Sequence, residues 1–290
     1  MKRCLVVVLS VRGLAQTTKS GSDDPQLTYT TIDVPGHSTI LSGINNNGVI
    51  AGQYDYSGGD YRSFTWEKGA FDYFSLPTGY TLAYGINDAG LVGGYYITTG
   101  TDRAGFLYDG QTFTTVQYPG VPITEATGIN NAGLIVGIEA SDPAHYTGFL
   151  FNGTQFRTFV VPGPDTRATW PGGVNNFGDI SGTVDSGGAY EGFWRSRAGK
   201  YQTFAYPGAI FTSAAGINDN RIIVGGYLGN ALQSCFYMKG GKFKSFAVPH
   251  AMETICLGIN NAGVIVGYYQ DSQYTLHGFM TSPVTDADLQ

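Results

Sequence analysis

The chain has 290 residues, of which only 13% are charged, and its formal net charge is −6. Nucleic acids and anionic membrane surfaces are bound mainly through clustered lysines and arginines, so an acidic chain without a basic cluster argues against both as partners. The 43 glycines and the 14% share of aromatic residues favour short strands joined by tight turns. We therefore expect an all-β protein that binds no nucleic acid.

The first 26 residues have the layout of an export signal followed by a spacer. Lys2 and Arg3 precede a short apolar run, and Ala15 is a small residue suited to cleavage. Such a run directs secretion but is too short to span a bilayer. We expect residues 1–15 to be a signal peptide, residues 16–26 to be a flexible segment, and the mature protein to be extracellular or periplasmic. Membrane insertion is not expected, because no later segment is long and apolar enough.

A short pattern recurs six times along the chain. The copy GINNAGVIVGYY covers Gly258–Tyr269, and the other copies begin at Gly43, Gly85, Gly128, Gly173 and Gly216. Two residues after its first glycine each copy has an asparagine: Asn45, Asn87, Asn130, Asn175, Asn218 and Asn260. Asparagine bonds its own backbone and tolerates the left-handed conformation, so it is typical of hairpin turns. These six asparagines are therefore predicted to be structural residues of the repeat.

Each repeat unit predicts four short strands, which the third unit illustrates in chain order. A first strand is expected over residues 124–130 and, after the turn, a second over 133–139. A third strand is expected over 147–152 and a fourth over 155–161. The fourth ends before Pro162, which cannot donate to a strand ladder. Four short strands in such a unit match one blade of a β-propeller, so the six units predict six blades.

The two ends of the repeat region are incomplete in complementary ways. Residues 27–34 have the pattern of a fourth strand but precede the first unit, and the sixth unit stops after its third strand. If residues 27–34 complete the last blade, the ring closes and no strand edge stays exposed. We therefore expect a six-bladed, closed, monomeric propeller over residues 27–282, followed by a C-terminal tail over residues 283–290.

The repeats resemble the HAF-type extracellular repeat of bacteria, a poorly characterised family named for a His-Ala-Phe tripeptide after a GINNxGxVVG-like segment. In this chain only the phenylalanine of the tripeptide is kept in every copy: Phe64, Phe106, Phe149, Phe193, Phe236 and Phe279. The resemblance implies export and a repeat fold, and it implies no particular activity.

A threonine lies four residues before the first glycine of every copy: Thr39, Thr81, Thr124, Thr169, Thr212 and Thr254. Two arrangements are open for these hydroxyls. They line a polar pore entrance, or they form structural hydrogen bonds at the start of each blade. The structural arrangement is favoured.

Two cysteines would remain after signal cleavage, Cys235 and Cys256. Both lie in apolar segments with strand character. We expect them to be buried and unpaired, with a disulfide as the alternative.

Loop aromatics are the strongest indication of a ligand. In a propeller the connections between blades and those between second and third strands emerge on one face, around the channel mouth. On this face we expect a ligand-binding set: Tyr80, Tyr96, Tyr146, Trp170 and Phe211. Tyrosine and tryptophan combine an apolar ring with a polar group, which suits sugars and peptide segments. The sequence thus favours a secreted binding module for carbohydrate or protein.

Two other functions stay open. Glu125 and Glu253 lie at the starts of inner strands in opposite blades, where a carboxylate pair would support a hydrolase or a lyase. A structural role at the cell surface or in a matrix is the third hypothesis. No metal or cofactor is expected. Ca²⁺ is the alternative, because the loops between second and third strands contain scattered acidic residues without the alternate spacing of a calcium loop.

Overall fold

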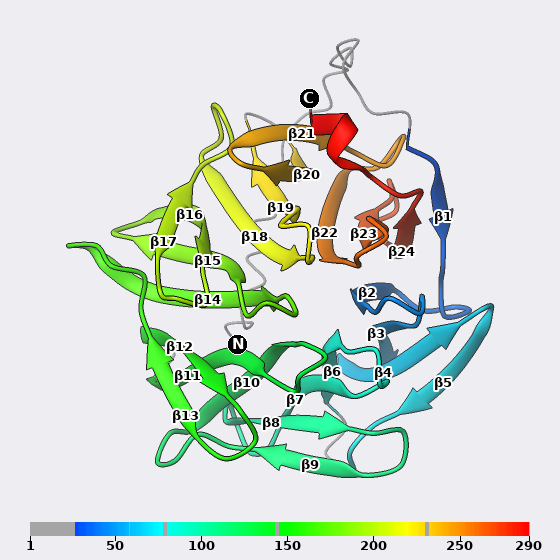
Figure 1. Ribbon diagram of the computed structural model, residues 1–290. Helices are drawn as coiled ribbons and strands as arrows, with labels where there is room; N and C mark the ends of the chain where they lie inside the picture. The colour runs from blue at the N-terminus through cyan, green and yellow to red at the C-terminus, as the bar shows by residue number, and fades with distance from the viewer. Residues whose placement is uncertain (1–26, 58, 78–79, 143–144, 230–231, 290) are drawn as a thin grey trace.

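The computed structural model describes residues 27–57, 59–77, 80–142, 145–229 and 232–289. The predicted signal peptide and the segment 16–26 lie outside these residues. Within the described part of the chain, six four-stranded antiparallel units stand radially around a central axis, as Figure 1 shows. The fold is a six-bladed β-propeller.

The strands follow the chain from the axis outward in blades 1 to 5. Blade 1 consists of β2 (Thr39–Ile44), β3 (Ile50–Ser57), β4 (Asp60–Glu67) and β5 (Ala70–Phe74). Blade 2 consists of β6 (Thr81–Ile86), β7 (Val92–Ile97), β8 (Arg103–Tyr108) and β9 (Phe113–Val116). Blade 3 consists of β10 (Ile123–Ile129), β11 (Ile135–Asp142), β12 (His145–Phe151) and β13 (Phe156–Phe159). Blade 4 consists of β14 (Thr166–Val174), β15 (Ile180–Ser186), β16 (Ala189–Arg195) and β17 (Tyr201–Phe204). Blade 5 consists of β18 (Phe211–Ile217), β19 (Ile223–Leu228), β20 (Gln233–Lys239) and β21 (Lys242–Phe246). Blade 6 consists of β22 (Glu253–Ile259), β23 (Ile265–Gln270) and β24 (Leu276–Thr281), with β1 (Tyr29–Thr31) as its outermost strand. A 3₁₀ helix, η1 (Asp286–Leu289), follows.

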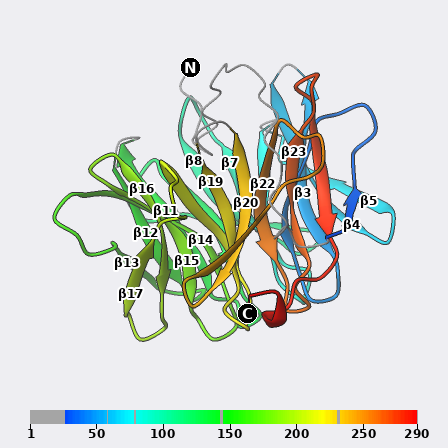
Figure 2. The same cartoon turned by 90° about the horizontal axis from the view of Figure 1, so that it is seen from above.

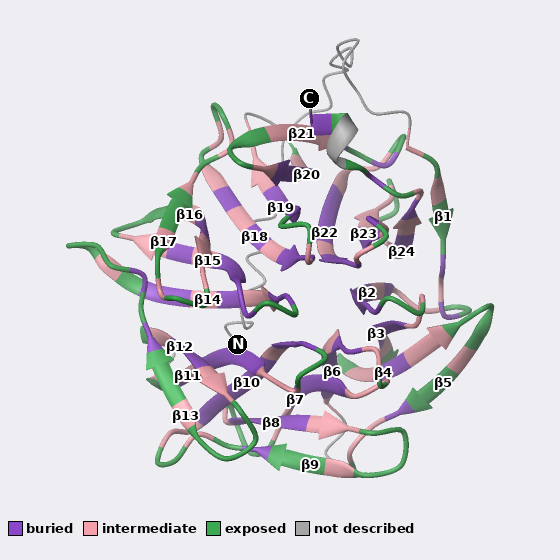
Figure 3. Cartoon of the chain, viewed as in Figure 1, coloured by how far each residue is buried: buried purple, intermediate pink, exposed green. Residues whose placement is uncertain are grey.

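Burial decreases with distance from the axis, as Figure 3 shows, because inner strands are covered by both neighbouring blades while outer strands face solvent. The side view in Figure 2 shows η1 on one of the two faces of the propeller. The turns that contain the repeat asparagines lie on the same face. The last of these turns contacts the segment before η1, because the N–H of Val284 donates to the carbonyl of Gly263. Val284 and Leu289 are buried there, so the C-terminal residues pack onto the propeller. No helix in the described residues has the length and apolarity to cross a membrane.

The recurring phenylalanine packs on a glycine directly across the ladder from it. In blade 3, Phe149 of β12 pairs with Gly137 of β11, and a Cβ on Gly137 would lie 2.7 Å from the phenylalanine ring and 1.9 Å from the carbonyl oxygen of Glu125. The same pairs recur in the other blades: Gly52–Phe64, Gly94–Phe106, Gly182–Phe193, Gly225–Phe236 and Gly267–Phe279. All six phenylalanines are fully buried. This packing explains why the phenylalanine is kept in every copy.

The six threonines form structural hydrogen bonds rather than a pore lining. Each hydroxyl accepts from the backbone N–H of the residue that precedes a blade-ending proline; in blade 3 the donor to Thr124 is Tyr118, at 3.1 Å. The corresponding donors in the other blades are Val34, Leu76, Val161, Tyr206 and Val248. Each bond thus fixes the connection that leads into a new blade.

The predicted closure is confirmed. β1 pairs antiparallel with β24, in the register Tyr29↔Thr281 to Thr31↔Phe279. The N–H of Ile32 then donates to the carbonyl of Gly278 at 2.9 Å, which extends the ladder beyond the strand. The N-terminal strand therefore supplies the outer edge of the last blade.

A histidine at this closing seam lies between two carboxylates. Nδ1 of His277 is 2.7 Å from an oxygen of Asp33, which follows β1, and its Nε2 is 3.3 Å from Asp271. Burial by itself would lower the pKa of His277, but hydrogen bonds and charge from both carboxylates outweigh burial and raise this pKa above its ordinary value. In its protonated form the ring is therefore paired with both carboxylates at the seam.

We expect the contribution of this pairing to stability to depend on pH. Because the folded-state pKa is raised, the stabilisation is complete below the unfolded pKa of about 6.5 and is lost as the pH rises through the folded value. As the pH rises above about 6.5, the melting temperature should fall more steeply in the unmodified chain than in a His277→Gln variant. Differential scanning calorimetry measures both curves, and parallel curves would show that His277 does not stabilise the seam through its charge.

The expectation of unpaired cysteines is wrong. Cys235 in β20 and Cys256 in β22 form a disulfide with a Cα–Cα distance of 5.5 Å. Their separation of 21 residues in sequence did not indicate this, because it is the packing of the third strand of blade 5 against the first strand of blade 6 that brings them together. A cross-link over a loop of this length stabilises a fold by about 3 kcal/mol, mainly by restricting the unfolded chain.

Candidate functional site

A central channel runs between the innermost strands of the six blades. Each innermost strand has a β-bulge at the same place, and the residue displaced by the bulge lines the channel. In β2 the ladder to β3 shifts between Leu41 and Gly43, so Ser42 stands outside the register and faces the axis. The equivalent residues of the other blades are Tyr84, Thr127, Gly172, Ala215 and Leu257. We call these six residues the bulge ring. They line the channel from all six blades.

Glycines next to the bulge ring let the inner strands approach one another closely. A Cβ on Gly85 would lie 3.0 Å from the Cα of Gly128 in the next blade, and a Cβ on Gly258 would lie 3.1 Å from the Cα of Gly43 across the closing seam. A Cβ at such a distance is tighter than ordinary van der Waals contact, so any larger residue would push the two strands apart by a few tenths of an ångström. The first glycine of the repeat therefore determines the narrow radius of the channel.

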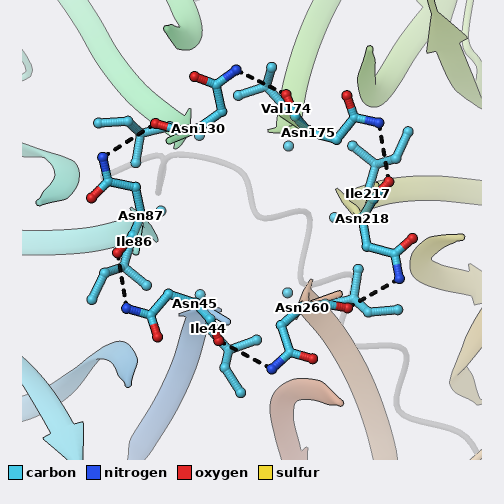
Figure 4. Close-up of a pocket in the computed structure, with 18 of the residues that line it drawn as sticks. Ile44, Asn45, Ile86, Asn87, Asn130, Val174, Asn175, Ile217, Asn218 and Asn260 are labelled. Carbon is cyan, nitrogen blue, oxygen red and sulfur yellow. Dashed lines mark hydrogen bonds between the residues drawn. The ribbon is translucent and has the colours of Figure 1, made fainter. Parts of the chain in front are cut away.

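Two residues after these glycines, at the ends of the inner strands, the six repeat asparagines form a closed ring of hydrogen bonds, which Figure 4 shows around the channel. The side-chain amide of each donates to the backbone carbonyl of the asparagine in the next blade, and Asn260 donates to Asn45 at 3.1 Å across the seam. The other five bonds are Asn45–Asn87, Asn87–Asn130, Asn130–Asn175, Asn175–Asn218 and Asn218–Asn260. Their predicted structural role thus includes joining the blades.

A second ring surrounds the first on the same face. Each residue after a repeat asparagine donates its backbone N–H to the side chain of its counterpart in the next blade; the six are Asn46, Asp88, Asn131, Asn176, Asp219 and Asn261. Burial alone would raise the pKa of Asp88, but donors from Asn46 and Asn131 lower it below its ordinary value. The polar side chains on the face with the asparagine turns therefore bond mainly to one another. The cavity of about 110 Å³ on this face is lined by these structural residues.

A larger cavity of about 200 Å³ lies on the opposite side of the bulge ring, towards the connections between blades. One buried water needs only ~10–15 Å³, so the cavity is large enough for a small organic ligand. Four aromatic residues of blades 3 to 5, which we call the aromatic wall, line one side of it: Tyr146, Trp170, Tyr190 and Phe211.

The rings of the aromatic wall are in contact with one another. Trp170 and Tyr190 are stacked at 20° with centroids 6.1 Å apart. Tyr146 lies 5.8 Å from Trp170, and Phe211 lies 5.3 Å from Tyr190. A parallel backbone bridge between Tyr190 of β16 and Phe211 of β18 joins blades 4 and 5 at this point. The wall is therefore a continuous aromatic surface held by three blades.

Polar groups complete the cavity. Glu125 lines it and is buried, and its carboxylate accepts a hydrogen bond from the guanidinium of Arg103. The hydroxyl of Ser42 is buried and has no hydrogen-bond partner among the described residues. Thr183 and Gln233 add neutral polar atoms. The cavity thus combines an aromatic surface with a few hydrogen-bonding groups, which is the usual composition of a small-molecule site.

The structure brings together three of the five predicted ligand-binding residues, namely Tyr146, Trp170 and Phe211. Trp170 lies within β14 and Phe211 is the first residue of β18, so neither lies in a loop as expected. Tyr80 and Tyr96 are not among the residues that line this cavity.

The two candidate carboxylates are not in the same cavity. Glu125 lines the larger cavity, whereas Glu253 is not among its lining residues, and burial raises the pKa of Glu253. In the described residues no group of three or more histidine, cysteine, aspartate or glutamate side chains is arranged to hold a metal ion. A catalytic role for either glutamate stays a prediction.

Sequence reasoning missed the bulge ring. The residue before the first glycine of the repeat differs in all six copies, but the two positions before it vary as well. The sequence therefore does not single out this position.

Comparison with known proteins supports the fold. Similar solved structures include a catalytically inactive variant of virginiamycin B lyase from Staphylococcus aureus with quinupristin, at a TM-score of 0.51 and 9% identity over 88% of this chain and 99% of that one. The Aleuria aurantia lectin, a six-bladed propeller with fucose recognition, matches at a TM-score of 0.55 and 11% identity over 88% and 98%. A mutant of AofleA from Arthrobotrys oligospora, in which three arginines are replaced by alanine, matches at a TM-score of 0.58 and 12% identity over 88% of this chain and 86% of that one.

At these identities the likeness shows the six-bladed fold and no more. No family model matches the chain, and no curated protein does. The resemblance to HAF repeats therefore stays a prediction from the sequence.

Proposed function

We propose that the protein is an exported carbohydrate-binding propeller that holds a saccharide in the larger cavity, against the aromatic wall. The observation that carries the proposal is the contact of four aromatic rings along one side of a cavity that also presents hydroxyl and carboxylate groups. Apolar faces of sugar rings stack on such surfaces, while sugar hydroxyls need hydrogen-bonding partners.

A saccharide fits this site better than a protein partner does. Stable protein interfaces are broad surfaces that bury about 800 Å² on each partner, whereas this site is a concave cavity with an aromatic lining and a few polar groups, as is usual for a small ligand. The proposed export agrees with the disulfide between Cys235 and Cys256, because disulfides persist in oxidising compartments. Similar folds among fucose-binding lectins are consistent with this function.

The proposal is tested with two matched pairs of variants. Phe211→Ala and Tyr190→Ala remove rings from the aromatic wall, whereas Tyr80→Ala and Tyr96→Ala remove tyrosines that do not line the cavity. A thermal-shift screen of neutral methyl glycosides first selects a bound sugar; at 100 times its dissociation constant it should stabilise the fold by about 2.7 kcal/mol. Calorimetric titration should then show affinity about tenfold weaker, or ~1.4 kcal/mol, in each wall variant.

Both control variants should bind as the unmodified chain does. If the wall variants fold normally and bind the sugar with unchanged affinity, the cavity is not its site. If no sugar in the screen is bound, the carbohydrate function itself is contradicted.

Turnover of a sugar is the second candidate, because Glu125 is a buried carboxylate in the cavity wall. Glycoside hydrolysis ordinarily needs two carboxyl groups about 5–10 Å apart, and Glu253 does not line this cavity. Binding is therefore the better-supported function. Product release from the selected sugar that is lost in Glu125→Gln would instead favour an enzyme.

A further inference from the structure

We propose that the cavity recognises the end of a neutral glycan, inserted along the propeller axis, with the hydroxyl of Ser42 bonding the terminal sugar. This inference rests on the proposed function and names the part of the saccharide that is bound. It is carried by the closed geometry of the channel, by the polarity of the bulge ring and by the charge of the cavity.

The geometry of the channel admits a glycan only by one of its ends. The bulge ring contains one residue from each of the six blades, and β1 closes the ring of blades by pairing with β24. A polymer lying across the face of the propeller cannot reach the interior of such a channel. A linear glycan enters it only by a terminus or by the tip of a branch.

The bulge ring has one polar and one apolar half. Blades 1 to 3 contribute Ser42, Tyr84 and Thr127, whereas blades 4 to 6 contribute Gly172, Ala215 and Leu257. A sugar has the same division, with hydroxyls at its edge and an apolar face. In this orientation the apolar face lies towards the blades that also carry most of the aromatic wall.

Ser42 is the group that most needs a ligand. Its side chain is only 6% exposed and its hydroxyl has no partner in the described structure, although Thr127 in the same ring donates to the carbonyl of Pro171 at 2.7 Å. A buried polar group without a partner is unfavourable, and a ligand hydroxyl at the floor of the cavity would satisfy it.

The charge of the cavity selects against acidic sugars. Among the described residues that line it, Glu125 is the only ionic side chain, and the guanidinium of Arg103 already pairs with it. A uronate or sialate carboxylate would be buried beside Glu125 without a cation of its own, which is costly. The preferred terminal residue is therefore a neutral hexose, deoxyhexose or N-acetylhexosamine.

The test uses methyl glycosides of glucose, galactose, mannose, fucose, N-acetylglucosamine and N-acetylgalactosamine, and the uronides of the first three. At least one neutral monosaccharide glycoside should bind, since one terminal residue reaches the floor. Its extended oligosaccharide should bind no worse, and uronides should bind at least tenfold more weakly than neutral glycosides. Ser42→Ala should weaken binding of the neutral glycoside about tenfold, while Ser272→Ala, on an exposed loop, should leave it unchanged.

Failure of this inference differs from failure of the proposed function. Sugar binding that depends on Phe211 but is unchanged in a folded Ser42→Ala variant would overturn end-on recognition and leave carbohydrate binding in place. Equal or tighter binding of uronides, or binding of polymers whose terminal glycosides do not bind, would overturn it as well. Absence of any sugar binding would overturn both. A melting curve checks that Ser42→Ala folds, which is expected because its hydroxyl has no hydrogen-bond partner among the described residues.

Discussion

A chain that begins at residue 36 is expected to be less stable by at least about 5 kcal/mol than a chain that begins at residue 27. The shorter chain loses the ladder between β1 and β24 and the buried side chains of Ile32 and Val34, which are 5% and 4% exposed. Loss of one buried aliphatic side chain costs about 2–4 kcal/mol, and the last blade would also expose an unpaired edge. The loss is comparable with the whole stability of an ordinary domain.

Urea unfolding of both chains measures this difference. The chain that begins at residue 27 is the matched control, because it keeps every described residue. Equal unfolding midpoints for the two chains would show that the N-terminal strand does not close the ring.

Replacing one asparagine of the inner ring is expected to have the second-largest effect. Asn175→Ala removes the inter-blade bond to the carbonyl of Asn218 and leaves the N–H groups of Phe177 and Asp179 without their acceptor. A buried group without a partner costs about 1–3 kcal/mol, so we expect a loss of about 3 kcal/mol in unfolding free energy.

Asn152→Ala provides the control. Asn152 accepts from the N–H groups of Thr154 and Gln155 in the exposed turn between β12 and β13, so it has the same local bonds in a solvated turn. Its loss should cost less than about 1 kcal/mol. Similar costs at Asn152 and Asn175 would mean that the asparagine ring contributes no more than an ordinary turn.

The architecture was predictable because it depends on local, repeated features. Six copies of one motif determined the number of blades, and the pattern of residues 27–34 determined how the ring closes. The asparagines lie in the turns after the inner strands, where their side chains accept from backbone N–H groups, as Asn45 does from Asn47 and Val49. Their bonds to the next blade were not predicted, since the distance between blades follows from glycines whose role is visible only in three dimensions.

Departures from the repeat were harder to interpret. The fifth copy has Arg221 where the others have a turn glycine, and its backbone has a φ of 60°. The guanidinium of Arg221 lies 2.7 Å from a carboxylate oxygen of Asp179, a buried residue of blade 4. This ion pair joins two positions that are unremarkable when each is considered alone. The disulfide between Cys235 and Cys256 escaped prediction for the same reason.

The site was predictable in part. Three of the five aromatic residues expected on one face, Tyr146, Trp170 and Phe211, line the same cavity. Tyr80 and Tyr96 belong to the same sequence class but lie elsewhere. Ser42 was not predicted, because a β-bulge shifts it out of the strand register and towards the axis.

The central claim, a saccharide held in the cavity, is tested most directly by the fluorescence of Trp170. The chain has three tryptophans, and Trp66→Phe together with Trp194→Phe leaves Trp170 as the only one, within the cavity wall. Titration with the neutral glycoside chosen by the thermal screen should change its emission saturably, and Phe211→Ala in the same background should shift the curve about tenfold to higher concentration. A glycoside that stabilises the protein but leaves Trp170 emission unchanged would contradict the account, because it would bind outside this cavity.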